Sequence, residues 1–444
     1  MKKIFLLSLM LLIAQNAFAN VIDRTISSSG INKEAVSISV KDTATGKVVY
    51  GHNEFKPSVP ASTLKMVTLS ASLDTLGNDY EFSTKLYKNT NNELYLKLGA
   101  DPFLSSSDLN KLFEIARDKK IAEPKKIYFD NFIFDNNEWG EGWQWDDDLN
   151  PLMPKYSSFN IDKNLLNIVI APTNQGAPAN IYTTKFYPTT FMNLVTTGSV
   201  NNITLSRNNN ISPDILNVEG TIKKQITKQV PINNLKRYFI LRCEDAIRNA
   251  NIAYYDNIIQ KKTPASNIYL AGEIIHPISN AVTEILTKSN NMVAETVFKL
   301  AGAKFANNTG SFANSQKMLN TYFDKIGLDY SSIRIVDGSG VSKNNMLTAD
   351  FMSEFLVKMS NSDDFKNSLP TAGEGTLADR MLYFKDNLRA KTGTHCSESA
   401  IAGYITAKSG KTYAFDIMIN DPKSKNAEKK SLEEYIIRDI YSKF

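Results

Sequence analysis

Alternating hydrophobic and polar residues predict β-strands at both ends of the chain. Near the start, residues 35–41 alternate, Thr45-Gly46 forms a turn, and residues 47–51 return, which is typical of a hairpin. Near the end, residues 387–394, 400–407 and 412–419 read as three successive strands, the last two joined by Ser409-Gly410. Because helical segments accompany both groups, the two ends together predict one antiparallel sheet that is covered by helices.

Helical spacing of hydrophobic residues marks two of these segments. One begins at Ser62 and is expected to stop at Gly77, and its apolar stripe consists of Met66, Leu69, Leu73 and Leu76. The other ends the chain, with the apolar positions Leu432, Tyr435, Ile436, Ile440 and Tyr441. Since the charges of this last segment are mixed rather than basic, a helix facing the core is favoured over a helix on a membrane surface.

Residues 85–263 have a different character. They are rich in Asn and Thr, and short alternating runs at 93–98, 202–205 and 216–222 are separated by turn signals such as those at 89–92 and 208–210. We interpret this region as a β-rich insertion, made of two small domains. It would divide a catalytic domain, residues 20–84 and 264–444, in sequence but not in space.

Residues 1–19 have the features of a secretory signal peptide. Lys2 and Lys3 precede a mostly apolar run at 4–14, and Ala17-Phe18-Ala19 has the small-x-small pattern of a cleavage site. An uncleaved membrane anchor is the alternative, although the run is short for a membrane span. No later run reaches spanning length, so we expect a mature protein without a transmembrane segment that is soluble outside the cytoplasm.

The overall composition argues against several classes of function. Removal of Lys2 and Lys3 with the signal peptide lowers the net charge from +5 to +3, which is too near neutral to suggest a nucleic acid partner. Three scattered histidines and the lack of HExxH or a Cys/His cluster speak against a zinc hydrolase. No G-x-S-x-G occurs, which weakens an α/β-hydrolase interpretation. We therefore expect neither a metal nor an organic cofactor.

The two cysteines leave one question open. Cys243 and Cys396 could form a disulfide in an oxidising compartment, or they could remain two inert thiols. The sequence does not show whether they meet.

The chain contains a single Ser-x-x-Lys, Ser62-Thr63-Leu64-Lys65, at the start of the first predicted helix. Side chains three residues apart on a helix share a face, about 5–6 Å apart at Cβ. A serine hydroxyl and a lysine amine in this arrangement can act as nucleophile and base without a histidine. Taken alone, the same residues could be a helix cap and a solvated charge.

Two further motifs change this interpretation. Ser289-Asn290-Asn291 and Lys391-Thr392-Gly393 follow downstream, in the order found in active-site serine penicillin-binding enzymes. Each alone could be structural, the first as a helix cap and the second as a strand end. Together they lie on a helix, a loop-to-helix junction and a strand, which are the elements that the chemistry requires.

The chemistry assigns a task to each motif. Lys65 can act as a base only when neutral, so its pKa must fall well below about 10.4, and burial and the nearby cation of Lys391 would both lower it. The N–H groups of Ser62 and Thr394 could form an oxyanion hole. Ser289 could relay a proton to the leaving amine, and Asn291 could hold the substrate backbone.

Taken together, the chain resembles the D-alanyl-D-alanine carboxypeptidase/endopeptidases of the penicillin-binding protein 4 type, the class C group. Beside the three motifs, the resemblance includes 60–62, 98–102, 142–147, 218–222, 337–340 and 373–377. It implies a serine β-lactamase/transpeptidase-like α/β (α+β) domain, with an antiparallel sheet flanked by helices and two inserted accessory domains. It also implies periplasmic cleavage of peptidoglycan stem peptides through an acyl-enzyme, with β-lactams as covalent inhibitors.

The resemblance also implies roles for individual residues. The nucleophile falls on Ser62, the base on Lys65, and the other catalytic residues on Ser289, Asn291 and Lys391. The expected substrate-binding residues are Thr392, Gly393, Thr394, Asp147 and Lys343. Asp147 looks like the acid that meets the amino end of a diaminopimelate side chain, with an ordinary loop acid as the alternative.

Three residues depart from the pattern of this group. His395 stands where an apolar residue is usual, Cys396 where a polar one is common, and Lys343 where arginine is frequent. A lysine gives a point charge rather than a planar fork, so we expect weaker recognition of a carboxylate there. We expect His395 to lie at the rim of the cleft rather than to act in catalysis.

Two other functions remain open on the sequence alone. A β-lactamase shares all three motifs, although the long insertion argues against it. A non-catalytic protein that binds peptidoglycan or senses β-lactams could retain the serine for trapping, although the intact Lys65, Ser289, Asn291 and Lys391 argue against that.

Overall fold

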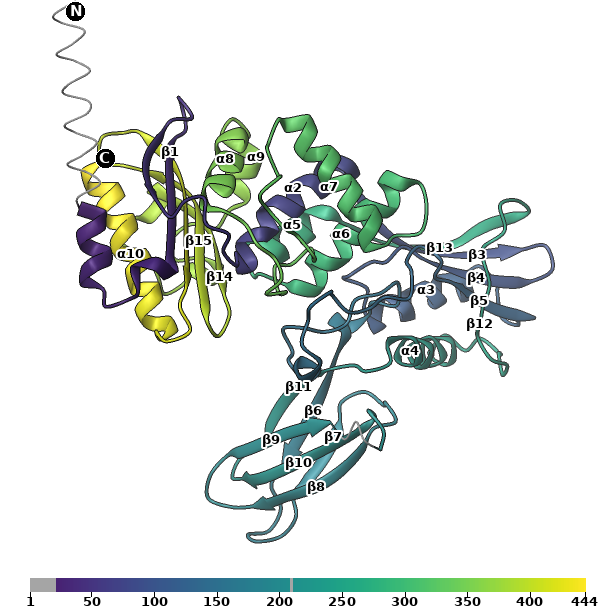
Figure 1. The fold of residues 1–444 in the computed structure, drawn as a ribbon. Coiled ribbons are helices and arrows are strands. Elements are labelled where there is room, and N and C mark those ends of the chain that lie inside the picture. Colours follow the sequence, from purple (N-terminus) through teal and green to yellow (C-terminus); the bar gives the residue numbers. More distant parts are fainter. Residues whose placement is uncertain (1–20, 208–210) are drawn as a thin grey trace, which may run out of the picture.

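A computed structural model describes residues 21–207 and 211–444 of the chain. The predicted signal peptide and the turn predicted at 208–210 lie outside the described residues. Figure 1 shows a main body that contains both ends of the chain, a sheet that projects from one end of this body, and a smaller strand-rich lobe below that sheet.

The main body contains the antiparallel sheet predicted from the two ends of the chain. In spatial order its strands are β14 (Leu388–Thr394), β15 (Glu398–Thr406), β16 (Thr412–Asn420), β1 (Val36–Asp42) and β2 (Val48–His52). β1 pairs with β16, so the N-terminal hairpin joins the three C-terminal strands directly. The predicted hairpin and the predicted three strands are therefore confirmed, with ends that differ by one or two residues.

Helices cover both faces of this sheet. On one face, α10 (Asn426–Lys443) and a helix over residues 21–28 pack with apolar side chains such as Ile22 and Ile436 against the strands. On the other face, α8 (Ala349–Met359) contacts β1 and β16. The C-terminal helix that the hydrophobic spacing predicts is thus confirmed as a core-facing helix.

The helix predicted after Ser62 lies at the centre of the helical half of the body. It begins with a 3-10 turn, Ala61–Leu64, and continues as α2 (Lys65–Leu76), and Gly77 ends it as predicted, with a φ of +90°. Its neighbours are α5 (Ile278–Leu286), α6 (Asn291–Ala306), α7 (Phe312–Ile326) and, beyond α5, α9 (Asp363–Ser368).

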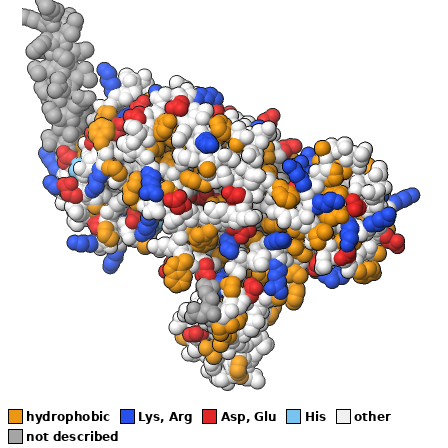
Figure 2. Space-filling model, turned by 45° about the vertical axis from the view of Figure 1, so that its right-hand side comes forward, with side chains coloured by type: hydrophobic (Ala, Val, Ile, Leu, Met, Phe, Trp, Pro, Cys, Tyr) orange, Lys and Arg blue, Asp and Glu red, His pale blue; other side chains and the backbone are white. Residues whose placement is uncertain are grey.

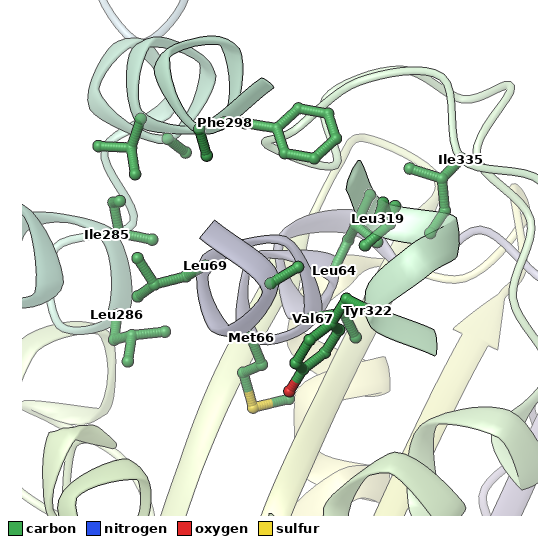
Figure 3. Packing of buried hydrophobic residues seen from close by; sticks show 14 of the residues in the cluster. Leu64, Met66, Val67, Leu69, Ile285, Leu286, Phe298, Leu319, Tyr322 and Ile335 are labelled. Carbon is green, nitrogen blue, oxygen red and sulfur yellow. The ribbon is translucent and has the colours of Figure 1, made fainter. Parts of the chain in front are cut away.

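α2 is enclosed more completely than a single apolar stripe predicts. Figure 3 shows Leu69 directed toward Ile285 and Leu286, while Leu64 and Val67 lie on the side of Leu319 and Tyr322. Every residue from Lys65 to Ser72 is buried. A helix that is covered on several sides belongs to a core, so the first turn of α2 holds its side chains in a fixed setting.

The projecting sheet is formed by strands from both ends of the inserted region. Its order is β12 (Ile259–Gln260), β5 (Lys126–Asp130), β4 (Glu93–Leu98), β3 (Glu81–Asn89) and β13 (Ile268–Pro277). Because β3 pairs with β13, the chain leaves and re-enters the main body at neighbouring points. Residue 84, where we predicted a boundary, lies within β3, and residue 264 lies shortly before β13.

Two helices that the sequence pattern did not predict pack with this sheet: α3 (Ser106–Asp118) and α4 (Leu235–Asn249). Ser105 and Asp108 form a capping box at the start of α3, and Leu109, Leu112 and Phe113 form its buried side. These local signals were present, but the Asn-rich composition around them directed the interpretation toward strands.

The smaller lobe contains two three-stranded sheets. One has the order β11 (Ile226–Pro231), β6 (Leu165–Ala171), β7 (Asn180–Thr183), and the other β8 (Thr190–Thr197), β10 (Ile215–Ile222), β9 (Asn202–Arg207). The runs predicted as strands at 93–98, 202–205 and 216–222 are all strands.

The surface carries mixed charge. Figure 2 shows Lys and Arg interspersed with Asp and Glu over the face that it displays. Among the described helices, none combines the length and the apolar character that crossing a membrane requires. Cys243 is buried, Cys396 is exposed, and both are free thiols, which answers the question left open by the sequence.

Candidate active site

The nucleophile–base pair predicted from Ser-x-x-Lys lies at the junction of the 3-10 turn and α2. Side chains three residues apart are eclipsed in a 3-10 helix, which aligns Ser62 with Lys65. The distance from Lys65 Nζ to Ser62 Oγ is 2.8 Å. Lys65 is completely buried, whereas Ser62 is partly exposed and therefore open to a substrate.

Three oxygens surround the Lys65 amine. Besides Ser62 Oγ, its Nζ lies 2.6 Å from Asn291 Oδ1 and 2.6 Å from the Ser339 carbonyl oxygen. As an ammonium, Lys65 can donate to all three oxygens. As a neutral amine, it has two donors for the Asn291 and Ser339 oxygens and one lone pair for the Ser62 hydroxyl.

Burial is the main cause of the low pKa at this lysine. It lowers the pKa of Lys65 to about 7, while the carboxylates of Asp337 and Glu295 act in the opposite direction. We predicted that Lys391 would contribute to this shift as a nearby cation. Instead, Lys65 acts as the nearby cation for Lys391. Burial and the charge of Lys65 lower the pKa of Lys391 well below its ordinary value.

The second motif is placed by the start of α6. Asn290 caps this helix, since its side chain accepts a hydrogen bond from the Val293 N–H at 3.1 Å. Ser289, just before the cap, has a φ of +59°, and its Oγ lies 2.8 Å from Lys391 Nζ. The capping role therefore falls on the middle residue of the motif and leaves Ser289 and Asn291 to face the two lysines.

The third motif lies on β14, against the residue that carries the nucleophile. Lys391 is fully buried and also donates to the Thr392 carbonyl, at 2.7 Å. A Cβ at Gly393 would lie 2.7 Å from the Ser62 nitrogen and 2.9 Å from the Pro60 oxygen, so only glycine lets the strand come this close. The Thr392 hydroxyl contacts Thr376 Oγ1 at 2.6 Å, and Thr394 is exposed.

Two buried carboxylates complete the site, and the sequence analysis assigned no role to either. Glu295 accepts hydrogen bonds from the N–H groups of Gly338, at 3.0 Å, and Ser339, at 2.7 Å. Asp337 accepts from the N–H groups of Gly340 and Ser342. They fix the loop whose Ser339 carbonyl contacts Lys65. Burial and the nearby Asp337 raise the pKa of Glu295 to about 8.

A signal for Glu295 was present in the sequence. It follows Asn291 by four residues, so both lie on one face of α6. The loop at 337–340 had been noticed only as part of the resemblance. Its Gly340 has a φ of +76°, and a Cβ there would lie 2.0 Å from the Ala61 oxygen, so the loop packs directly against the nucleophile turn.

The remaining predicted site residues lie away from this cluster. Asp147 ends a short 3-10 turn, Trp145–Asp147, and is partly exposed. The same loop reaches the site through Leu152, whose carbonyl accepts a hydrogen bond from Asn291 Nδ2 at 2.8 Å. Lys343 lies 3.5 Å from the Glu398 carboxylate and 3.5 Å from Cys396 Sγ.

His395 lies beside the loop that contacts Lys65. Its Nε2 is 3.0 Å from the Gly340 carbonyl oxygen, and burial lowers its pKa. It is half-buried, with no hydrogen bond to the catalytic cluster among the residues that the structure describes.

A comparison with known families agrees with this geometry. The family described as the D-Ala-D-Ala carboxypeptidase 3 (S13) family matches residues 18–437. The chain belongs to this family. It is therefore a serine-type D-Ala-D-Ala carboxypeptidase, and the mixed α+β fold predicted from the sequence is confirmed.

Individual relatives of this S13 carboxypeptidase span nearly the whole chain. It is 25% identical over 434 residues to a D-alanyl-D-alanine carboxypeptidase of Actinomadura sp. (strain R39), covering 90% of this chain and 80% of that protein. It is 22% identical to D-alanyl-D-alanine carboxypeptidase DacB of Haemophilus influenzae, covering 91% of each.

A solved structure extends the similarity to the fold of the S13 chain. The crystal structure of penicillin binding protein 4 (dacB) from Haemophilus influenzae superimposes with a TM-score of 0.81 at 22% identity, covering 91% of this chain and 95% of that one. The projecting sheet and the smaller lobe thus belong to a fold that the two proteins share.

Proposed function

We propose that Ser62, Lys65, Ser289, Asn291 and Lys391 carry out the D-Ala-D-Ala carboxypeptidase reaction of this chain on peptidoglycan stem peptides. One observation supports this most strongly. A fully buried Lys65 amine, whose other two contacts are neutral oxygens, lies 2.8 Å from the Ser62 hydroxyl. This is the arrangement that a lysine requires to act as a base.

The first half of the reaction forms an acyl-enzyme. Lys65 removes the proton of the Ser62 hydroxyl as Oγ attacks the carbonyl carbon between the two D-alanine residues. The N–H groups of Ser62 and Thr394 stabilise the oxyanion. The C–N bond then breaks, and the proton that Lys65 accepted passes through Ser289 and Lys391, whose side chains are 2.8 Å apart, to the amine of the terminal D-alanine. Lys65 is then neutral again.

In the second half, a water molecule hydrolyses the ester. Lys65 takes a proton from the water as the water oxygen attacks the acyl carbon. The ester C–O bond then breaks, and Lys65 returns that proton to Ser62 Oγ. The stem peptide departs with a new terminal carboxylate. An endopeptidase reaction on D-alanyl–diaminopimelate cross-links requires the same steps with a larger amine as leaving group.

Substrate contacts fall to residues around this cluster. Thr392 and Thr394 bind the terminal carboxylate of the substrate, and Gly393 lets the substrate backbone approach β14. Asp147 binds the amino end of a diaminopimelate side chain. Lys343 adds positive charge at the far edge of the cleft, although the Glu398 carboxylate, 3.5 Å away, offsets part of that charge.

The same nucleophile would be trapped by β-lactams. The penicillin binding protein 4 of Haemophilus influenzae has also been solved in complex with a β-lactam, and its fold matches this chain with a TM-score of 0.77. The predicted signal peptide supports export, and a substrate in the cell wall supports a periplasmic location. We propose both for this chain.

Two measurements test the proposal. The purified protein is expected to release D-alanine from a pentapeptide that ends in D-Ala-D-Ala, and fluorescent penicillin is expected to label it but not the Ser62→Ala variant. Undiminished labelling of that variant would contradict the assignment of the nucleophile. Labelling without D-alanine release would indicate a sensor, and rapid, sustained nitrocefin turnover would indicate a β-lactamase.

A further inference from the structure

A polar crevice of about 520 Å³ lies outside the catalytic cleft, where the projecting sheet meets the start of α4. Its lining comes from separate parts of the chain, including the end of β5, the loop that follows it and the segment before β6. The residues used below are Asn131, Asn136, Glu138, Ser158, Asn233 and Lys236.

Several polar groups in this crevice have no partner within the protein. Ser158 is only 6% exposed, yet its hydroxyl makes no hydrogen bond to any described residue. The side-chain amides of Asn136 and Asn233 are likewise unpaired within the described ranges 21–207 and 211–444. Asn131 accepts a hydrogen bond from Gln260 at 2.7 Å, and this leaves its NH₂ group available. These groups line the crevice without a partner among the described residues, so their donors and acceptors are available to a polar ligand.

The charge of the lining favours a neutral ligand. The two acids, Asp135 and Glu138, are balanced by Lys155 and Lys236. Asp135 is in addition paired with Lys299 at 2.5 Å. Amides and hydroxyls, which both donate and accept hydrogen bonds, form most of the remaining lining. Hydroxyl and acetamido groups complement such a surface, and these are the polar groups of the N-acetylated sugars in peptidoglycan.

The position of the crevice fits the length of a stem peptide. Asp135, in the crevice lining, contacts Lys299, which lies on α6 eight residues after Asn291. At 1.5 Å per residue, Lys299 is about 12 Å along α6 from Asn291, and the crevice lies beside Lys299. Four extended residues span about 13–14 Å, so a peptide cleaved at Ser62 would bring its sugar to this distance.

We propose that this crevice binds an N-acetylated sugar of the glycan strand from which the scissile stem peptide extends. The inference rests on the proposed function for the identity of the substrate. It implies that the enzyme binds the sugar and the peptide at the same time. A stem peptide still attached to its glycan is then the better substrate.

Direct binding tests the crevice without reference to catalysis. Saturation-transfer NMR with the full chain and N,N′-diacetylchitobiose is expected to show saturable binding. We expect the binding to be lost in Asn136→Trp, which fills the crevice from an exposed position, and to be weakened in Ser158→Ala. The control is Asn217→Ala, at a half-buried position of β10 in the smaller lobe, and it should bind as the wild type does. Lack of saturable binding, or equal binding by Asn136→Trp, would overturn the proposal.

Steady-state kinetics test what sugar binding in the crevice implies for substrate preference. The kcat/KM for a disaccharide pentapeptide is expected to exceed that for the free pentapeptide by about tenfold, the value of one or two net hydrogen bonds. Asn136→Trp should make the two kcat/KM values equal and leave hydrolysis of the free pentapeptide unchanged. Equal values for both substrates in the wild type would contradict the proposal. If neither peptide is cleaved, the proposed function fails, and the binding measurement still decides the role of the crevice.

Discussion

Lys65 and Lys299 are both buried lysines, and they differ in the groups that surround the side-chain amine. Lys299 contacts the Asp135 carboxylate at 2.5 Å and the Asn137 carbonyl at 2.7 Å, and it lies over the rings of Phe134 and Tyr156. Lys65 contacts only a hydroxyl, an amide oxygen and a carbonyl.

This difference separates a structural cation from a base. Burial lowers the pKa of both lysines, but at Lys299 the contacting Asp135 works against that shift. The carboxylates near Lys65 are Asp337 and Glu295, and both are occupied by backbone N–H groups of the 337–342 loop. The Lys65 amine is therefore buried without an acid in contact, and this is the setting that a lysine requires to act as a base.

The largest expected effect comes from removing the base itself. Lys65→Met should lower kcat for D-alanine release by roughly 10²–10⁴, the usual contribution of a general base. Its matched control, Lys299→Met, removes an equally buried amine and should leave kcat within a few-fold of the wild type. Steady-state kinetics on the pentapeptide measure both. A similar loss of kcat in both variants would contradict the proposal that Lys65 is the base and Lys299 is structural.

A carboxylate placed beside Lys65 should convert it toward the setting of Lys299. In the wild type, kcat/KM should fall about tenfold per pH unit below about 7, because a protonated Lys65 cannot accept the serine proton. Asn291→Asp puts an acid at the position now 2.6 Å from Nζ, which should raise the pKa of Lys65 and move this acidic limb upward by about 1–3 pH units.

The sequence motif also predicts a contact of Asn291 with the substrate backbone, so the two effects of its substitution need to be separated. Loss of substrate contact alone would lower the whole profile without moving its limb. An unchanged limb in Asn291→Asp would therefore argue against Lys65 as the titrating group.

Removing the hydrogen bonds that hold the Ser339 loop should have an intermediate effect on the rate. Glu295→Ala removes the acceptor of the Gly338 and Ser339 N–H groups, so the carbonyl on Lys65 loses its support. Acylation should therefore slow by about tenfold, the value of one or two net hydrogen bonds. Glu295→Gln keeps one acceptor oxygen and should recover most of the rate. Stopped-flow acylation by a chromogenic β-lactam provides the measurement.

A control for Glu295 is available in another buried carboxylate. Glu433 accepts hydrogen bonds from Ser399 and Arg380 on the far side of the sheet. Glu433→Gln should leave acylation unchanged. A loss equal to that of Glu295→Ala would mean that any damage to the core slows the reaction.

The smallest effect is expected at the structural lysine. Asp135→Asn removes the ion-pair partner of Lys299, and Asp135 is 37% exposed, so solvent screens part of the interaction. The free energy of unfolding should fall by about 1 kcal/mol, with kcat unchanged. Urea denaturation measures the stability, and a loss of activity would show that the Lys299 region reaches the reaction.

The parts of the site that the sequence predicted are those encoded by residue type at short spacing. Ser62 and Lys65 are close because three residues separate them, and Lys391 and Gly393 are placed by a strand whose alternation is visible. The Ser339 contact has no such signature, since a backbone carbonyl can come from any residue and its loop is distant in sequence. Asp147 and Lys343 remain predictions, because the contacts that would define them require a bound substrate.

The fold was predictable to a similar extent and for the same reason. The end strands alternate, and Gly77 marks a helix end by its conformation. α3 was missed although Ser105 and Asp108 cap it, because overall composition was given more weight than a local cap. The enclosure of α2 was also missed, since hydrophobic spacing describes one helix and burial depends on the elements packed around it.

The pairing of β1 with β16 has a consequence for the newly made protein. Ser62 is made before Lys391 and before β15 and β16, the strands that complete its sheet. A chain cut before β14 lacks Lys391 and the partner strand of β1, so we expect its Ser62 to be inert both toward stem peptides and toward β-lactams.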